Sequence, residues 1–205
     1  MTARQDSSIA ALAIAIAAMC AVVVGSNILV QHPFEPFGLA DYLTWGAFSY
    51  PVSFLVTDLT NRRFGVARAR LVVYVGFALA VALSIALATP RIALASGTAF
   101  LIGQLSDVTI FDRLRLGTWW RAPLVSSLIG SALDTILFFT LAFAGDPEIP
   151  LSTYPLGFGE VTLPVWVVWA VCDFLVKMSL ALVALGPYRA LARLLAPQPE
   201  PVPVP

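Results

Sequence analysis

The sequence is short of charge, histidine and cysteine. Only 12% of its 205 residues are charged, it has one histidine, and its 12 Lys and Arg residues balance its 12 Asp and Glu residues. A neutral chain has no overall field to attract nucleic acid. Cys20 and Cys172 have the spacing of neither a zinc site nor a disulfide framework. We therefore expect no metal, no cofactor and no nucleic-acid partner, and no glycine-rich loop indicates ATP hydrolysis.

Long hydrophobic runs, in contrast, are abundant. The sequence is 59% hydrophobic, whereas soluble domains are about half apolar and about a quarter charged. A transmembrane helix needs about 20 mostly apolar residues. Six such spans are predicted, over residues 9–30, 39–57, 71–88, 92–111, 123–144 and 163–186. The first run is too long for the apolar part of a signal peptide, so we expect it to be retained.

The basic residues show how these spans are oriented. With the N-terminus in the cytoplasm, ten of them fall on cytoplasmic segments: Arg4, Arg62, Arg63, Arg68, Arg70, Arg113, Arg115, Arg121, Arg189 and Arg193. Only Arg91 falls outside, and Lys177 lies within a span, which fits the positive-inside rule. The sequence predicts an all-α integral membrane protein, a six-helix bundle with both termini cytoplasmic. Residues 1–195 would form one domain, 145–162 a short outer loop, and 196–205 a disordered proline-rich tail.

Ionisable residues within spans are candidates for function because burying them in the bilayer is costly. Asp173 and Lys177 are four residues apart and share a helix face with Trp169. The alternative is an ion pair within one helix that only neutralises itself for insertion. Asp134 has no basic neighbour on its own helix, so it needs a partner from elsewhere or a proton. The amide of Asn27 is equally suited to a ligand or to a neighbouring helix.

Two further predicted spans carry polar stripes. Gln104 and Asp107 share one face, and Tyr50 and Asp58 share another. For Asp58 a surface ion pair with Arg62 is favoured over a contact with substrate. Carboxylates on four spans, together with amides, an ammonium and aromatic rings, predict a central polar cavity. It would suit an organic solute with a flat face and hydrogen-bond donors.

Several stretches carry a resemblance to a known family. They are GSNILVQ (25–31), TWGAFSYPVSFLVTDLTNRRFG followed by ARAR (44–70), GTAFLIGQLSDVTIFDRLR (97–115), WWRAPLVSSLIGSALDTILFFTLAF (119–143) and CDFLVKM (172–178). With these motifs the sequence resembles the queuosine precursor transporter family, also described as vitamin uptake transporters. The resemblance implies a six-helix protein of the bacterial inner membrane that imports 7-cyano-7-deazaguanine (preQ0), with the aminomethyl form (preQ1) as a second candidate. These precursors are used for queuosine modification of tRNA.

The motifs also contain most of the candidate substrate-binding residues. Those within matching stretches are Asn27, Tyr50, Asp58, Gln104, Asp107, Asp134, Asp173 and Lys177. Arg91 lies just before one motif, and Trp169 lies on the face of Asp173. A guanine-like edge presents two adjacent N–H donors to a carboxylate, and its carbonyl oxygen accepts from a donor such as Lys177.

Several functions compete at this point. The favoured one is a transporter that works in the lipid bilayer alone or as a homodimer, with proton coupling suggested by Asp134. A second is the substrate-binding subunit of a vitamin importer with separate ATPase partners. A third, less favoured, is an intramembrane aspartyl protease in which Asp134 and Asp173 share a proton. A fourth is a membrane scaffold without substrate.

Overall fold

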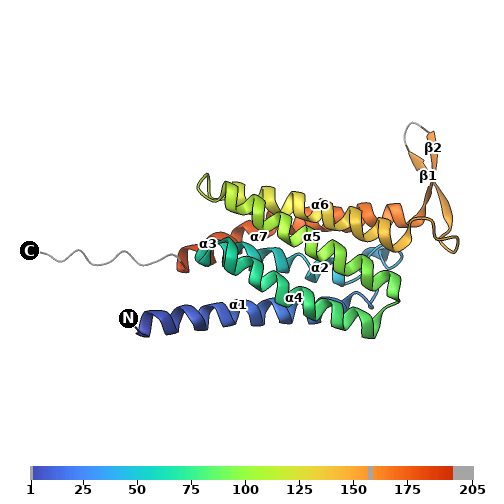
Figure 1. Cartoon of the computed structure of the whole chain (residues 1–205). Coiled ribbons are helices and arrows are strands. Elements are labelled where there is room, and N and C mark those ends of the chain that lie inside the picture. The colour runs from blue at the N-terminus through green and yellow to red at the C-terminus, as the bar shows by residue number, and fades with distance from the viewer. Residues whose placement is uncertain (1, 157–158, 196–205) are drawn as a thin grey trace, which may run out of the picture.

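The structure, a computed structural model, describes residues 2–156 and 159–195, and the predicted tail at 196–205 lies outside these ranges. Most of the described chain is helical (Figure 1). The helices are α1 (Thr2–Leu29), α2 (Gly46–Ser49), α3 (Val52–Phe64), α4 (Val66–Leu87), α5 (Pro90–Leu114), α6 (Arg121–Phe143) and α7 (Val165–Leu194), with a short 3-10 helix η1 (Pro36–Gly38) before α2.

Five of these helices are long and apolar enough to cross a membrane. They are α4, α5, α6, α7 and the Ser8–Leu29 part of α1. Each contains an 18-residue window with at most two charged residues, a length that suits the hydrocarbon core of a bilayer. The first and the third to sixth predicted spans are thus confirmed as helices, although α7 continues beyond residue 186, through Pro187, to Leu194.

The second predicted span, 39–57, is wrong in position and continuity. Residues 39–45 are not helical, and the helical segment is broken between α2 and α3 at Pro51. Proline has no N–H to donate, so the helical hydrogen bonding is interrupted at Pro51, although Tyr50 and Pro51 keep helical backbone angles, with φ/ψ of −58°/−40° and −60°/−17°. The segment also extends to Phe64, beyond the predicted end, and α3 contains charged residues that lower its hydropathy. Gly65, with a φ of +81°, ends it, because glycine adopts positive φ without strain.

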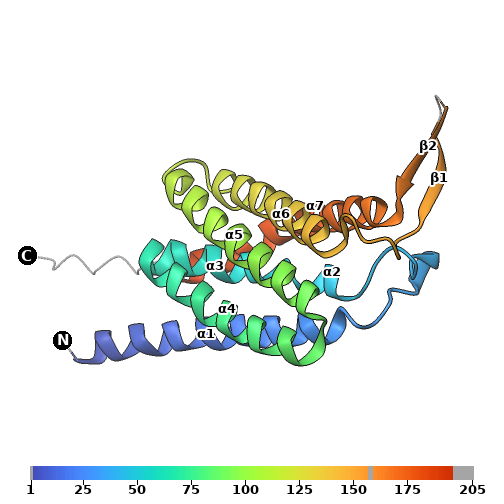
Figure 2. The same ribbon diagram turned by 45° about the vertical axis from the view of Figure 1, so that its right-hand side comes forward.

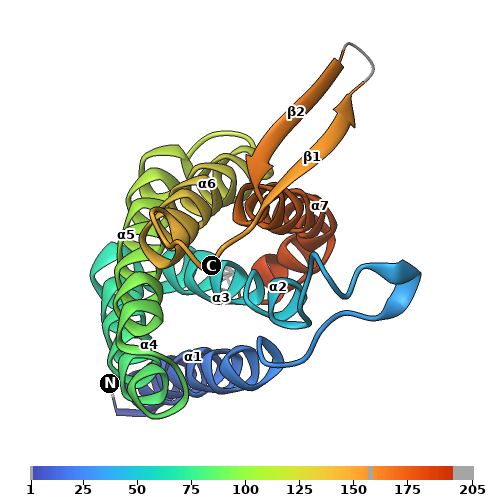
Figure 3. The same cartoon turned by 90° about the vertical axis from the view of Figure 1, so that its right-hand side faces the viewer.

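The broken segment runs through the middle of the bundle. Figure 3 shows α3 surrounded by the other helices, and α3 contacts each of the five long ones. The start of α1 and the end of α7 lie at the same end of the bundle, together with the α3–α4 and α5–α6 connections (Figure 1). In chain order, the α2–α3 segment follows α1 and precedes α4, and it therefore returns the chain to this end of the bundle. As a result, polar side chains on α3 face protein on several sides.

The prediction of an all-α chain is wrong for the outer loop. Strands β1 (Leu151–Leu156) and β2 (Gly159–Pro164) form an antiparallel hairpin that projects from the end of the bundle (Figure 2). Thr153 pairs with Thr162, and their hydroxyl oxygens are 3.0 Å apart. The segment includes Thr153, Tyr154, Val161 and Thr162, residue types that are enriched in strands.

Small residues bring α5 and α6 close together. A Cβ added at Gly103 would lie 3.1 Å from the Gly130 carbonyl oxygen, and one added at Gly130 would lie 3.0 Å from the Gly103 oxygen. Such close backbone approach is typical of small residues in membrane helix pairs. It places Asp107 and Asp134, whose Cβ atoms touch these glycines, on the two sides of one seam.

Candidate functional site

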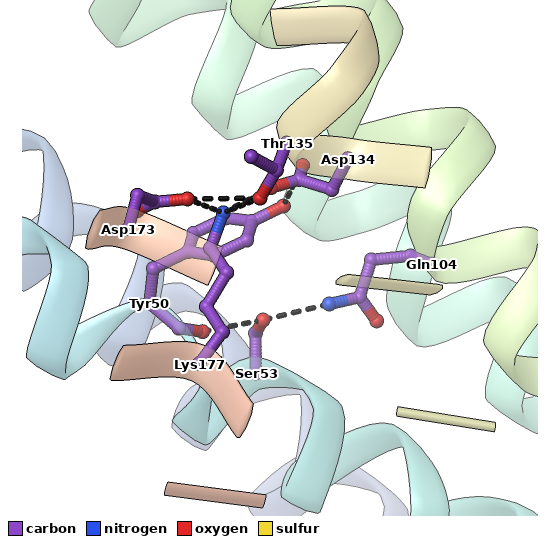
Figure 4. Close-up of polar contacts among 7 residues, drawn as sticks. All are labelled: Tyr50, Ser53, Gln104, Asp134, Thr135, Asp173 and Lys177. Atoms are coloured by element: carbon purple, nitrogen blue, oxygen red, sulfur yellow. Dashed lines mark hydrogen bonds and ion pairs between the residues drawn. The ribbon is translucent and has the colours of Figure 1, made fainter. Parts of the chain in front are cut away.

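A lysine from α7 lies between two carboxylates. Lys177 Nζ is 2.6 Å from Asp173 Oδ2, one turn earlier on the same helix, and 2.8 Å from Asp134 Oδ2 on α6 (Figure 4). The side chains are 5%, 14% and 7% exposed, respectively. A charge removed from water this far needs both an opposite charge and hydrogen bonds. The three groups supply these to one another.

Two hydroxyl groups complete this site. Tyr50 donates its phenol to Asp134 Oδ1 at 2.9 Å, and its ring lies beside the ammonium, 5.4 Å from Nζ to the ring centre. Thr135 donates to Asp173 Oδ2 at 2.9 Å and accepts from Lys177 at 3.0 Å. We call these five residues the Lys177 cluster. It joins α6 and α7 to Tyr50, which lies in the break between α2 and α3.

The arrangement decides between two sequence interpretations. The sequence left Asp134 with either a partner from elsewhere or a proton, and the structure provides a partner on another helix, Lys177. The Asp173–Lys177 pair within α7 also exists, but it does more than neutralise itself because the same ammonium binds α6. Since the ammonium lies between the two carboxylates, they do not form the shared-proton dyad of an aspartyl protease.

A second polar group lies beside the first, between α3 and α5. Gln104 donates to Ser53 Oγ at 2.6 Å (Figure 4) and accepts from Thr57 at 3.1 Å. Next to them lie two carboxyl groups, of Asp58 on α3 and of Asp107 on α5, and Thr57 donates to Asp107 Oδ2 at 3.5 Å. We call these two residues the Asp58–Asp107 pair. They are 2% and 0% exposed, so this pair is buried within the bundle.

The predicted surface pair between Asp58 and Arg62 is wrong. Asp58 points into the bundle, where Ser126 Oγ donates to Asp58 Oδ1 at 3.4 Å. Arg62 instead donates to the carbonyl oxygen of Arg115 at 2.6 Å. Spacing along one helix suggested the pair, whereas α5 and α6 provide the actual neighbours of Asp58.

Sequence reasoning missed the hydroxyl groups. Ser53 and Thr57 on α3, Ser126 and Thr135 on α6, all buried or nearly so, bind the predicted carboxylates and amides. One signal was available for α3, since Ser53, Thr57 and Asn61 recur every four residues and thus line one face. Asn61 uses that face to donate to the Val108 carbonyl oxygen at 2.8 Å.

Three predicted residues lie outside both groups. Asn27 donates to Val23 of its own helix at 2.9 Å. Arg91 donates to the carbonyl oxygens of Leu141 at 3.0 Å and Ala144 at 2.6 Å, at the end of α6. Trp169 donates its indole N–H to the Asp41 carbonyl oxygen at 2.8 Å, linking α7 to the loop before α2.

A cavity of about 190 Å³ lies between α3, α6 and α7 and reaches both polar groups. Its polar lining consists of Asp58, Ser127, Ser131, Lys177 and Tyr188. The remaining lining is apolar or aromatic. A lining that combines charged and hydroxyl groups with apolar side chains suits a small, planar and polar organic molecule.

The described residues bring together no group of three or more His, Cys, Asp or Glu side chains that could hold a metal ion. The chemistry of this region is thus that of carboxyl, ammonium, hydroxyl and amide groups. These groups bind by hydrogen bonding and charge.

The sequence resemblance is supported by comparison with known proteins. The family described as "Putative vitamin uptake transporter" matches residues 44–89 and 84–191. The "Queuosine precursor transporter" of Escherichia coli (strain K12) is 33% identical over 183 residues, which cover 79% of this chain and 77% of the relative. The "Probable queuosine precursor transporter" of Haemophilus influenzae is 36% identical over 170 residues, which cover 67% of this chain and 72% of the relative.

A further relative, the "Probable queuosine precursor transporter" of Bacillus subtilis (strain 168), is 28% identical over 205 residues and covers 86% of this chain and 82% of its own. No solved structure matches the chain. The family match extends from α2 to α7 and thus includes both polar groups. This chain is therefore a multi-pass membrane protein of the vitamin uptake transporter family, a family of transporters and not of enzymes.

Proposed function

We propose that this protein imports a deazaguanine precursor of queuosine, with 7-cyano-7-deazaguanine as the first candidate, across the bacterial inner membrane. Relatives named queuosine precursor transporters support the substrate class. The observation that carries the proposal is the position of Lys177, which bridges Asp134 and Asp173 at the wall of a cavity. Lys177 lines this cavity and offers a strong donor, whereas the two acceptors, Asp134 and Asp173, are bonded to its ammonium and do not line the cavity.

The substrate edge and the cluster are chemically matched. A deazaguanine has a ring N–H and an exocyclic NH₂ side by side, which one carboxylate accepts as a pair of hydrogen bonds. Its carbonyl oxygen accepts from an ammonium. Asp173, the most exposed of the three charged groups at 14%, is the carboxylate we assign to the substrate N–H groups. Lys177 is assigned to the carbonyl oxygen, with Asp134 and Tyr50 holding it in place.

Aromatic side chains around Tyr50 suit the flat face of such a molecule. The Tyr50 ring packs edge-on against Phe54 and Phe100, each with its centre 6.1 Å away. Planar heterocycles stack on rings of this kind. The cavity, about 190 Å³, is smaller than the ~300–1,000 Å³ of typical ligand sites. We infer that α7 moves away from α3 and α6 when substrate enters, and we call the form described here the closed form.

We infer a six-span topology with both termini in the cytoplasm for a single transmembrane domain over residues 1–195. The broken α2–α3 segment serves as the second crossing. Support comes from Figure 1, in which α1 begins and α7 ends at one end of the bundle. Ten of the 12 basic residues belong to segments at that end, as the positive-inside rule requires of a cytoplasmic side.

We infer further that import is coupled to proton movement and needs no ATPase partner, with the protein working alone or as a homodimer in the bilayer. The buried interior holds four carboxyl groups, of Asp58, Asp107, Asp134 and Asp173, against the single ammonium of Lys177. Carboxylates in excess of cations in a dry interior take up protons. Abolition of uptake by a protonophore would support this coupling.

The experiment is uptake of labelled 7-cyano-7-deazaguanine into cells that lack queuosine synthesis and their own transporter. We expect this protein to restore queuosine in tRNA and the D173N variant not to do so at equal expression. Asp112→Asn is the matched control, because Asp112 pairs with Arg115 at 3.0 Å outside the cluster, and it should behave as wild type. A correctly inserted wild-type protein that fails to restore queuosine would overturn the proposal and favour a subunit that needs ATPases.

A further inference from the structure

We propose that the Asp58–Asp107 pair is the proton site of this transporter and is separate from the substrate site at the Lys177 cluster. The inference rests on the proposed function. It assigns proton binding to one polar group and substrate binding to the other, whereas the sequence alone placed both in a single polar cavity. The pair would hold one exchangeable proton, bound in one conformation of the transporter and released in another.

The first argument is the burial of two neighbouring carboxyl groups. Asp58 of α3 and Asp107 of α5 are 2% and 0% exposed, and Thr57, the residue before Asp58, donates to Asp107 Oδ2 at 3.5 Å. Two ionised carboxylates that neighbour each other would repel strongly without water around them. We therefore assign one proton to this pair in the closed form.

The second argument is what surrounds the pair. The described ion pairs are Arg91–Asp146, Arg115–Asp112, Lys177–Asp134 and Lys177–Asp173, none of which includes Asp58 or Asp107. Neutral donors approach instead, with Ser126 on Asp58 at 3.4 Å and Thr57 on Asp107 at 3.5 Å.

Two further observations complete the surroundings. Among the described residues, the buried Oδ1 of Asp107 has no donor. The other titratable groups near the pair are Tyr188 and Lys177, which share its cavity, and Arg62, whose guanidinium is held by the Arg115 carbonyl oxygen. One proton therefore reduces the charge of the pair from −2 to −1 in the closed form, where no cation compensates it.

The third argument is access. A proton sealed in the bundle could not exchange, but Asp58 lines the cavity of about 190 Å³ together with Ser127, Ser131, Lys177 and Tyr188. Such a volume has room for several water molecules next to polar side chains. Water in the cavity provides a path between Asp58 and the solution, and the same cavity reaches the Lys177 cluster. Release of the proton changes the charge of the pair from −1 to −2.

The fourth argument is the physical link between the two sites. Thr57 joins Asp107 to Gln104, and Gln104 donates to Ser53, whose hydroxyl donates to the Tyr50 carbonyl oxygen at 2.7 Å. The phenol of Tyr50 binds Asp134 at 2.9 Å.

The helix backbones provide a second route. The Cβ of Asp107 abuts Gly130 and that of Asp134 abuts Gly103, across one close seam. Repulsion after proton release would move α3 and α5 apart and would disturb both contacts. Proton binding and substrate binding would thus both shift the equilibrium between two packing arrangements of α3, α5 and α6.

The test uses purified full-length protein in proteoliposomes with labelled 7-cyano-7-deazaguanine. Two quantities are measured: exchange of substrate across the membrane without a gradient, and net accumulation under an imposed pH gradient. With one proton per substrate, a gradient of 1 pH unit drives up to about tenfold accumulation. We expect wild type to approach this ratio. We expect Asp107→Asn, which keeps a neutral hydrogen-bond donor beside Asp58, to exchange substrate but to reach a ratio of about one.

The matched control is Asp112→Asn, five residues further along α5 and outside the pair. It should retain both activities. A measurement that needs no variant is the proton flux itself, followed with a pH dye, which should equal about one proton per imported substrate. Accumulation by Asp107→Asn that matches wild type, substrate import without proton flux, or import driven by a sodium gradient would each overturn the proton site. Wild-type protein that exchanges no substrate would instead refute the proposed function.

Discussion

Lys177 of α7 and Asp134 of α6 form a buried ion pair, with 2.8 Å between Nζ and Oδ2 and side chains that are 5% and 7% exposed. The pair joins two helices that are separated in sequence by the β1–β2 hairpin. Because Lys177 also binds Asp173 at 2.6 Å, one ammonium compensates two carboxylates. The stability of α7 in the bundle thus depends on the same atom to which we assign the substrate carbonyl oxygen.

Removal of the ammonium should destabilise the protein strongly. We expect Lys177→Met to lower the free energy of unfolding by about 3–5 kcal/mol, because it leaves buried carboxylates without their cation. Thermal unfolding of the purified protein in detergent measures this loss. Adding Asp134→Asn and Asp173→Asn should recover most of it, since the uncompensated charge is then gone. Equal stability of K177M and wild type would show that the carboxylates do not depend on Lys177.

The close seam between α5 and α6 gives a second prediction. A Cβ at Gly130 would lie 2.9 Å from Phe54 Cε1 and 3.1 Å from Asp107 Cβ, as well as close to the Gly103 oxygen. We expect Gly130→Ala to destabilise the protein by about 1–3 kcal/mol through overpacking. Gly186→Ala is the control, because nothing lies within 4 Å of a Cβ there, and alanine favours a helix by up to about 1 kcal/mol. If Gly130→Ala lowered the free energy of unfolding less than Gly186→Ala does, the close packing of α5 against α6 at Gly130 would be contradicted.

Hydropathy and charge placement were sufficient for the long helices and insufficient for α3. Apolar runs of about 20 residues can be recognised without knowing what lies beside them. α3 contains Asp58, Asn61, Arg62 and Arg63, so its hydropathy is low. It lies within the bundle because its polar groups find partners on α5 and α6. Those partners come from tertiary packing, which no window along the sequence contains.

The same distinction explains the outcome for the candidate site. Asp173 and Lys177 could be paired in advance because helix geometry alone places residues four apart on one face. The need of Asp134 for a partner also followed from its surroundings in sequence, but the identity of that partner depended on how α6 packs against α7. The same spacing rule failed for Asp58 and Arg62, because Ser126 on α6 donates to Asp58 and Arg62 binds the Arg115 carbonyl oxygen.

Arg91 should act on stability and not on substrate affinity. Its guanidinium binds carbonyl oxygens of Leu141 and Ala144, which the end of α6 leaves without helical partners. We expect Arg91→Ala to cost about 1 kcal/mol of unfolding free energy and to leave the KM for uptake unchanged. Arg91→Lys should restore only part of the stability, because lysine lacks the forked donors of arginine. A KM raised about tenfold would instead place Arg91 in the substrate path.

Trp169 should restrain the loop between α1 and α2. Its indole N–H donates to the Asp41 carbonyl oxygen at 2.8 Å, and Phe34 and Leu43 of the same loop pack against α7. We expect Trp169→Phe to keep the ring but lose the hydrogen bond, worth about 0.5–1.5 kcal/mol, and thus to speed amide exchange in the loop by about two- to tenfold. The amides of Phe34 and Trp45, which bond within the loop, report this by hydrogen exchange.

Trp166→Phe is the matched control, since Trp166 is three residues earlier on α7 and makes no hydrogen bond to the described residues through its indole. It should leave exchange at Phe34 and Trp45 as in wild type. If Trp169→Phe and Trp166→Phe change exchange equally, ring packing and not the bond to Asp41 holds the loop. If only Trp169→Phe does so, the bond holds α7, which carries Lys177, to the loop between α1 and α2. Movement of α7 during substrate entry would then have to break it.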